Sequence, residues 1–475
     1  MVGYVRGLNR MKPEISPNGG SARERRKLEE RFEGRLAVNP LLTRKTVSYQ
    51  GNRRVPGFRW MKYKEGFSQT LVERLLDEFR PDSVLDPFAG IGTTPLIAAG
   101  RGLRAKGIEI MPVGVLVGNG IAQVANGLSR ETLEKSGAEL LDAVKSGYEA
   151  PSEYEFLHVR ITESAFPEEA EAAIARARHF IADVSDPSLK TLLDLACLTI
   201  LEDVSYTRKD GQYLRWDYRS GRTLRSRVDK GPILPFDHAL GARLFEMAQD
   251  IEPLKLSYGG GYPELITGSS LELMRNLPEA EFDMVITSPP YANRYDYTRT
   301  YALELAWLGY EQDDFLALRQ SMLSATVENR SKREWLKEIY RDDSELLNDA
   351  FRMYDEQEAI HEALTILRQH IDELGNRHVI RLIEGYFLEM AVIVAELGRV
   401  LRPGGVAIMV NDNVQYHGEE IPVDMILSDF AERSGFRCEK IWTLPRGKGN
   451  SSQQMRRFGR REIRKCVYQW MRSDD

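Results

Sequence analysis

The sequence SVLDPFAGIGTTPLIAAGRGLRAKGIEI, residues 83–110, decides the fold of this chain. It begins with a short apolar run, SVLD, which predicts a buried strand, and continues into a turn that contains Gly90 and Gly92. TTPLIAAGRG then predicts a helix, and AKGIEI predicts a second strand. A strand, a glycine turn, a helix and a strand in this order open a doubly wound α/β sheet.

The same alternation returns twice further along the chain. Residues 264–291, ELITGSSLELMRNLPEAEFDMVITSPPY, predict a strand, a helix, a strand and a sharp proline turn. From residue 387 onward the pattern predicts a helix, a strand, another helix and two closing strands. The stretches 118–262 and 311–380 are mainly helical in pattern instead. We therefore expect an α/β fold, a doubly wound Rossmann-like sheet with two mainly helical insertions.

This alternation divides the chain into core segments and inserted segments. We expect a charged N-terminal extension (1–45), a first core part with the glycine turn (46–117), a helical insertion (118–262), a second core part with the proline turn (263–310), a charged helical insertion (311–380) and a C-terminal core part with a basic loop (381–475).

The bulk composition indicates a globular protein of the cell interior. Of 475 residues, 42% are hydrophobic and 29% charged, and the net charge is −6. No run approaches the roughly twenty apolar residues that a membrane helix needs, and no secretion signal is visible at the N-terminus. Three distant cysteines and seven scattered histidines form no familiar metal motif. We therefore expect a cytoplasmic protein with no membrane association and no metal.

The glycine turn indicates a cofactor site. Glycine at positions 90 and 92 lets the backbone bend tightly and approach a ligand closely. Glu109 ends the next predicted strand, where a carboxylate can accept hydrogen bonds from ribose hydroxyls. A dinucleotide would use the same geometry, so these residues alone leave the cofactor open.

The proline turn TSPPY, residues 287–291, indicates the chemistry. Proline cannot continue a sheet ladder, so the double proline fixes a turn whose carbonyl oxygens can accept hydrogen bonds from an amine. Ser288 adds a hydroxyl acceptor, and Tyr291 adds an aromatic face on which a base can stack. The alternative is a turn that only ends a strand.

Together the two motifs resemble those of the amino-methylating DNA methyltransferases, which modify N4 of cytosine or N6 of adenine. The resemblance rests on Phe88, Gly90 and Gly92 in an FxGxG pattern and on the TSPPY turn. It covers the α/β core but neither insertion. It implies S-adenosylmethionine as the cofactor, double-stranded DNA as the partner, and a target base that is flipped into the site.

The resemblance assigns roles residue by residue. It implies that the target base is held by Ser288, Pro289, Pro290 and Tyr291. It implies that the cofactor is bound by Phe67, Ser68, Asp86, Phe88, Gly90, Gly92, Thr93, Glu109 and Ser269. Ser269 stands where the family often has an acidic residue.

The SPPY form is typical of N4-cytosine enzymes, so a site-specific cytosine-N4 methyltransferase is favoured. The glycine turn precedes SPPY in this chain, which is the reverse of the order in most SPPY enzymes. N6-adenine methylation is therefore the nearest alternative, and a catalytically silent DNA-binding subunit is an alternative of another class. A cognate restriction endonuclease is a further partner that the resemblance suggests.

Two basic stretches are candidates for contact with DNA. Residues 205–227, in the first insertion, mix arginines with aromatic residues, a composition suited to phosphates and bases alike. Residues 446–465 form a second basic stretch between the closing strands. The alternative for the first stretch is a solvated basic hairpin, and the alternative for the second is a generic charged turn. We expect DNA contacts from Arg208, Lys209, Arg215, Trp216, Arg446, Lys448, Asn450, Arg456, Arg457 and Arg460.

Overall fold

A computed structural model of the chain describes residues 16–210, 213–222, 228–445, 452–454 and 460–474. Its centre is one large sheet with the strand order β1-β11-β14-β8-β7-β2-β3-β6. All neighbouring strands are parallel except at β14, which is antiparallel to both β11 and β8. The strands are β1 (Leu36–Val38), β2 (Ser83–Asp86), β3 (Arg104–Glu109), β6 (Glu264–Thr267), β7 (Phe282–Thr287), β8 (Leu401–Asp412), β11 (Phe436–Thr443) and β14 (Lys465–Arg472).

The central strands are buried on both faces, which explains their continuous apolar sequence. Successive residues of a strand point to opposite faces, so β7 contributes to two cores. Met284 and Ile286 belong to one core, and Val285 belongs to the other. The first core is shared with α2 (Gln69–Phe79), α3 (Thr93–Gly100) and α4 (Pro112–Ala125), and the second with α10 (Ser270–Leu273), α17 (Val379–Val400) and α18 (Val423–Arg433).

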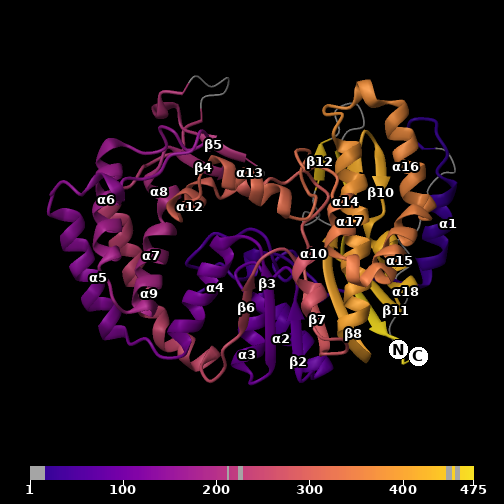
Figure 1. The fold of residues 1–475 in the computed structure, drawn as a ribbon, viewed down its shortest axis with the longest axis horizontal. Coiled ribbons are helices and arrows are strands. Elements are labelled where there is room, and N and C mark those ends of the chain that lie inside the picture. The colour runs from indigo at the N-terminus through magenta and orange to yellow at the C-terminus, as the bar shows by residue number, and fades with distance from the viewer. Residues whose placement is uncertain (1–15, 211–212, 223–227, 446–451, 455–459, 475) are drawn as a thin grey trace.

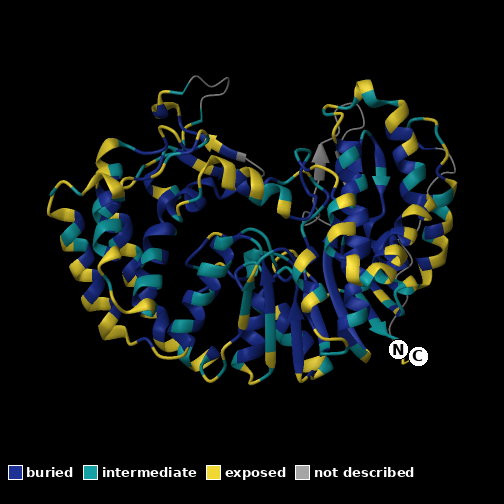
Figure 2. Cartoon of the chain, in the orientation of Figure 1, coloured by how far each residue is buried: buried dark blue, intermediate teal, exposed yellow. Residues whose placement is uncertain are grey.

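The helices of residues 118–262 lie to one side of the sheet and most helices of residues 311–380 to the other (Figure 1). The helix of residues 312–321 is the exception, because it lies near the first group, where the N–H of Arg160 donates to Gln312. The first insertion contains α5 (Arg130–Lys145), α6 (Glu168–Ala182), α7 (Pro187–Leu198), α8 (Leu201–Val204), the antiparallel hairpin of β4 (Thr207–Asp210) with β5 (Tyr213–Trp216), and α9 (Phe236–Tyr258). After β7 come α11 (Tyr297–Thr300) and α12 (Ala302–Trp307), followed by α13 (Gln312–Ser321), α14 (Arg333–Ile339), α15 (Ser344–Asp355) and α16 (Glu358–Gln369). Figure 2 shows the central strands buried and the outer faces of these helices exposed.

The predicted fold class is confirmed, because the chain forms a large, mainly parallel sheet covered by helices. The strands expected at 83–86, 264–267 and 282–287 are present. Two short hairpins accompany the sheet: β9 (Val414–Tyr416) with β10 (Glu419–Ile421), and β12 (Ser452–Gln454) with β13 (Arg460–Glu462). The division into core and inserted segments stays a prediction. Among the described residues, no helix combines the length and apolar character needed to span a membrane.

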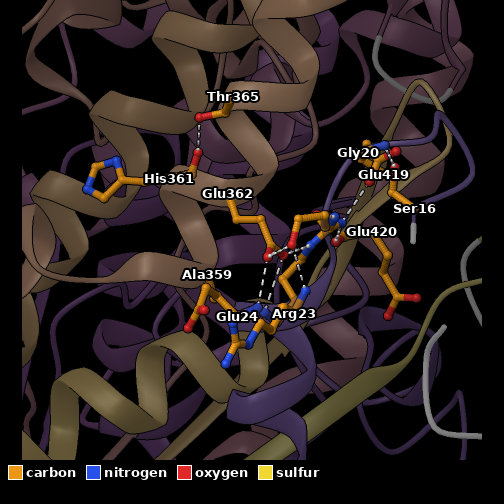
Figure 3. Close-up of polar contacts among 12 residues, drawn as sticks. Ser16, Gly20, Arg23, Glu24, Ala359, His361, Glu362, Thr365, Glu419 and Glu420 are labelled. Atoms are coloured by element: carbon orange, nitrogen blue, oxygen red, sulfur yellow. Dashed lines mark hydrogen bonds and ion pairs between the residues drawn. The ribbon is translucent and has the colours of Figure 1, made fainter. Parts of the chain in front are cut away.

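The N-terminal segment is joined to the core more closely than its charged sequence indicates. β1 pairs in parallel with β11 at the edge of the sheet. Arg25 of α1 (Arg23–Phe32) is buried and forms ion pairs with Glu362 (2.9 Å) and Glu419 (2.8 Å). Figure 3 shows the Glu362 carboxylate at the start of α1, where it accepts a hydrogen bond of 2.8 Å from the backbone N–H of Glu24. A carboxylate at a helix N-terminus satisfies free N–H groups and complements the helix dipole.

Candidate active site

The two sequence motifs meet where the strand order of the sheet reverses. β2 lies between β3 and β7, so the chain winds outward from this point in both directions. The Thr287 hydroxyl at the end of β7 donates to the Asp86 carboxylate at the end of β2 over 2.7 Å. The same carboxylate accepts from the backbone N–H of Phe88 over 3.0 Å. A single buried side chain therefore connects the turn after β2 to the turn after β7, at the edge of the sheet where open α/β folds bind ligands.

The glycine turn brings backbone N–H groups close to Glu109. Gly90 and Gly92 have φ values of 57° and 80°, a backbone conformation that residues other than glycine rarely adopt. The carboxylate of Glu109 accepts from the N–H of Gly90 and from the N–H of Met111, each over 2.6 Å. A Cβ at position 90 would lie 3.1 Å from the ring of Tyr63, so a larger residue would also crowd the turn. The turn and the carboxylate thus form one rigid unit.

Both carboxyl groups of this unit are buried. Burial raises the pKa of Glu109 to about 7, although hydrogen bonds from the N–H groups of Met111 and Gly90 favour the charged form. Burial also raises the pKa of Asp86 to about 6, against the hydrogen bond from Thr287. A carboxyl group that titrates close to neutral pH in a cavity is a candidate for a functional role.

A cavity opens between the two turns, and its empty space, with the open mouth included, amounts to about 790 Å³. Among the residues predicted for the site, those lining this cavity are Phe67, Asp86, Phe88, Gly90, Thr93, Glu109, Ser269, Ser288 and Pro290. Sequence reasoning missed others that also line it, including Tyr63, Glu65, Tyr297, Met322 and Leu323. The segment YKEGFS contains two of these missed residues, and its mixture of aromatic and charged residues beside Phe67 was the available signal.

Two of the predicted cofactor residues shape the site without lining this cavity. Ser68 is the N-cap of α2, where its hydroxyl accepts from the N–H of Leu71 and donates to the carbonyl of Thr46 over 2.8 Å. Gly92 occupies the N-cap position of α3. Neither residue is among those that line the cavity. Their part in the site is therefore to fix the backbone of its neighbours.

The SPPY turn is held by the strands beside β7. The Ser288 hydroxyl donates to the carbonyl of Val410 in β8 over 3.1 Å and lies 3.2 Å from the Tyr291 hydroxyl. The ammonium of Lys465, at the start of β14, donates to the Tyr291 hydroxyl over 3.3 Å and lies 3.2 Å from the Asp412 carboxylate. Pro289 and Tyr291 are not among the cavity-lining residues, whereas Ser288 and Pro290 are.

Lys465 is a positive charge that sequence reasoning missed. Burial disfavours its charged form, but Asp412 and Tyr291 outweigh that effect, so the pKa of Lys465 is raised. Its ammonium lies 3.3 Å from the Tyr291 hydroxyl and 5.1 Å from the centre of the ring, which places the cation at the hydroxyl end of that ring. Lys465 ends the second basic stretch, and only the fold distinguishes it from the arginines before it.

In the β4–β5 hairpin, the residues of the first insertion that were expected to contact DNA lie on two different faces. Arg208 and Arg215 pair across the hairpin and are both exposed. Lys209 and Trp216, one position further on, are buried. Lys209 forms a buried ion pair with Glu304 and lies 4.6 Å from the centre of the Tyr301 ring. Because strand residues alternate between faces, Lys209 and Trp216 anchor the hairpin and are withdrawn from the expected DNA contacts.

The second group of DNA candidates lies in a part of the chain that is only partly described. Arg446, Lys448, Asn450, Arg456 and Arg457 lie outside the described residues. Arg460 begins β13, which pairs with β12 between β11 and β14 in the chain.

The strand order, the glycine turn with its buried carboxylate and the proline turn beside it define a Rossmann-like methyltransferase fold. Comparison with known proteins then gives the family. The chain is 42% identical to the Type II methyltransferases M.AvaI of a Nostoc species and of Anabaena variabilis, over 93% of this chain and 92% of theirs. It is 40% identical to the Type II methyltransferase M.BsoBI of Geobacillus stearothermophilus, over 94% of this chain and 92% of that one. This chain therefore belongs to the Type II DNA methyltransferases. No family model and no solved structure matches it.

Proposed function

We propose that this protein transfers a methyl group from S-adenosylmethionine to N4 of cytosine within a specific sequence of double-stranded DNA. The observation that carries the proposal is the hydrogen bond between Thr287 and Asp86, which fixes the SPPY turn beside the glycine turn. A methyl donor in one turn and a base amine in the other would then meet in a single cavity. Such positioning accounts for much of the catalysis in a direct displacement.

The cavity has the chemistry to bind the cofactor. Glu109 offers a carboxylate for the ribose hydroxyls, while Phe67 and Phe88 supply apolar walls. Glu65 accepts a hydrogen bond from Tyr301 with one oxygen, and its other oxygen is buried with no hydrogen-bond partner among the described residues. A buried carboxylate oxygen without a partner suits an ammonium, such as the one on the methionine part of the cofactor. When bound, the cofactor supplies a sulfonium methyl group that is already electrophilic.

The SPPY turn supplies acceptors for the base amine. The Ser288 hydroxyl donates its hydrogen to Val410 and accepts from the Tyr291 hydroxyl, which leaves one lone pair to accept from an amine. The carbonyl of Pro289 would accept the second hydrogen, and two acceptors favour the pyramidal amine that attacks a methyl group. Lys465 holds the hydroxyl of Tyr291, and the base would stack on a face of its ring. This arrangement requires no separate general base.

The form of the turn supports cytosine as the target base. Serine before the two prolines favours cytosine N4, and adenine N6 is the competing product. Methylation of a plasmid with the purified protein, followed by nucleoside mass spectrometry, tests the assignment. N4-methylcytosine is the expected product, whereas N6-methyladenine alone would refute the base assignment and leave the site intact. If the protein binds DNA but no methylated base forms, it is a catalytically silent DNA-binding subunit.

Recognition of DNA is proposed for two separate regions. The exposed pair Arg208 and Arg215 suits base edges or phosphates, and the basic residues of 446–465 suit phosphates. We also propose that a cognate restriction endonuclease cuts the same sequence when it is unmethylated. Incubation of plasmids methylated by this protein with endonucleases of matched specificity tests that pairing.

A further inference from the structure

Three potential metal ligands converge at a place that the candidate active site does not use. They are His370, Glu373 and His417, whose ligand atoms all lie within 4.8 Å of one another. His370 Nδ1 lies 2.9 Å from one carboxylate oxygen of Glu373, and His417 Nε2 lies 3.6 Å from the other. The two imidazole rings are 5.3 Å apart between centres. Two imidazoles therefore flank one carboxylate.

The backbone holds each of these side chains in place. His370 and Glu373 are three residues apart at the end of the second helical insertion, where residues 371–373 form a single helical turn. His417 is at the tip of the β9–β10 hairpin, where Tyr416 pairs with Glu419. The chain is thus folded so that a helical turn faces a hairpin tip.

His417 adopts a backbone conformation that few residues tolerate. Its φ is 49°, and that of the following Gly418 is 82°, as a two-residue turn with both central residues left-handed requires. Asn18 donates to the carbonyl of His417 over 2.7 Å and to the carboxylate of Glu419 over 2.6 Å. The side chain of His417 is only 10% exposed. The backbone at His417 is therefore held in place, and its largely buried imidazole lies beside Glu373 and the ring of His370.

The spacing of the ligand atoms fits a small transition-metal ion. Two ligands bound about 2.0–2.1 Å from a tetrahedral ion lie about 3.3 Å apart. The measured distances of 2.9 Å and 3.6 Å reach different oxygens of Glu373, and one ligand atom from each residue lies within 4.8 Å of the others, so a small turn of the carboxylate would bring one oxygen to both imidazoles. Two imidazole nitrogens and a carboxylate suit zinc and its neighbours, whereas magnesium and calcium prefer oxygen ligands alone. We propose that His370, Glu373 and His417 bind a single divalent ion of the zinc class, with water completing its coordination.

The bound ion would have a structural role. The Tyr416 hydroxyl, next to His417 in the chain, donates to the carbonyl of Ala292, which directly follows the SPPY turn. An ion that joins the hairpin to the second helical insertion therefore stabilises the support behind the proposed base-binding turn. It lies on the far side of that hydrogen bond and takes no part in methyl transfer.

The competing explanation is a pair of histidine–glutamate hydrogen bonds with no metal. The test uses the full-length protein, stripped of metal with a chelator and titrated with zinc chloride by calorimetry. Two variants remove one ligand each: Glu373→Gln keeps the side-chain size, and His417→Asn keeps a residue that tolerates positive φ. His238→Asn is the matched control, because His238 is 73% exposed and pairs with no residue of the site.

We expect one zinc ion per chain and a zinc-dependent rise in the melting temperature of the wild-type protein. Both ligand variants should bind zinc on the order of 10-fold to 100-fold more weakly, while the control retains the wild-type affinity. Cobalt should give a visible absorption band that zinc abolishes in the wild type and that both variants lack. Zinc affinity that is equal in the wild type and both variants, or absent from the wild type, would overturn the proposal. If one variant fails to fold, the other variant and the cobalt spectrum of the wild type still test the proposed metal site.

Discussion

At the residue scale, Glu109 is expected to link the protonation state of the site to cofactor binding. Its pKa is about 7 because burial disfavours the carboxylate, so at about pH 6 most of the free protein carries a neutral Glu109. Ribose hydroxyls are bound best by the ionised form, which accepts hydrogen bonds only. Binding at about pH 6 should therefore release a proton, and the affinity should rise with pH up to about 7 and then level off.

Calorimetry of S-adenosylmethionine binding in buffers of different ionisation enthalpy measures this proton release directly. The Glu109→Gln variant should bind more weakly than the wild type at about pH 8, by a margin that shrinks toward about pH 6, and should show no proton release. An affinity that is the same at about pH 6 and about pH 8 would remove Glu109 from the ribose contact.

Glu65 is expected to contact the methionine part of the cofactor and not its adenosine part. Its unpartnered oxygen would contact the ammonium of the methionine part, so Glu65→Gln should weaken S-adenosylmethionine binding by about tenfold or more. Methylthioadenosine, which lacks the amino-acid group, should bind the variant and the wild type equally. A parallel loss for both ligands in a competition assay would show that the substitution only disturbs the cavity wall.

Ser288 is expected to act on the methyl-transfer step. Its hydroxyl is already oriented by the carbonyl of Val410, so Ser288→Ala removes an acceptor that matters as the amine becomes nucleophilic. Single-turnover methylation should slow by about 10-fold to 100-fold, roughly 1.4–2.7 kcal/mol, with little change in DNA or cofactor affinity. Ser146→Ala is the control, because Ser146 makes a similar bond of 2.7 Å to the carbonyl of Ala143 on an exposed helix end. A full rate in a Ser288→Ala, Tyr291→Ala double variant would exclude the SPPY turn from catalysis.

Single residues show where sequence reasoning succeeds and where it stops. Glu109 could be placed because a strand, a turn and the next strand fix its position locally. Ser68 is likewise a local feature, since it caps the helix that follows it. Lys209 could not be judged in the same way, because its buried ion pair depends on Glu304, far along the chain. His370 and His417 meet only through a hairpin that no periodicity reveals.

At the scale of elements, the segment before the cofactor residues is held by one carboxylate. Asp250 of α9 is buried and accepts from the N–H of Gly57 (3.0 Å), from the indole of Trp60 (2.8 Å) and from Arg59 (3.0 Å). Asp250→Asn leaves these donors poorly matched in a buried site and should lower the free energy of unfolding by about 2–4 kcal/mol. Urea unfolding measures the loss, and Glu252→Gln on the exposed side of the same helix is the control. An unchanged urea midpoint in Asp250→Asn would contradict this account.

Elements with continuous apolar sequence were predictable, and elements defined by pairing were not. β2, β7 and β8 are buried on both faces, so their composition alone indicates strands. β1 is three residues long, and it becomes a strand only because it lies beside β11, some four hundred residues later. In β4 and β5 the basic composition was visible, but only the pairing register separates the exposed Arg208 from the buried Lys209.

At the scale of the whole molecule, the first insertion is tied to the cofactor cavity. Lys209 of its hairpin pairs with Glu304 and packs on Tyr301, whose hydroxyl donates to Glu65 in the cavity wall. Tyr301 also stacks on Tyr63, 5.1 Å away between ring centres. The exposed arginines of the hairpin are therefore held at a fixed distance from this cavity, which suits the proposed reading of DNA sequence by the hairpin.

Reading a DNA sequence and holding the DNA backbone are expected to depend on different arginines of this protein. Arg208 and Arg215 share one exposed face, so Arg208→Ala, Arg215→Ala should relax the preference for the target sequence by about 1–3 kcal/mol per lost base contact. Replacing Arg456, Arg457 and Arg460 should instead weaken binding to all sequences and reduce the salt dependence by about one slope unit per lost phosphate contact. Binding to target and scrambled duplexes across a salt series measures both quantities in one experiment. If the hairpin variant loses affinity equally for both duplexes, recognition belongs to the second helical insertion instead.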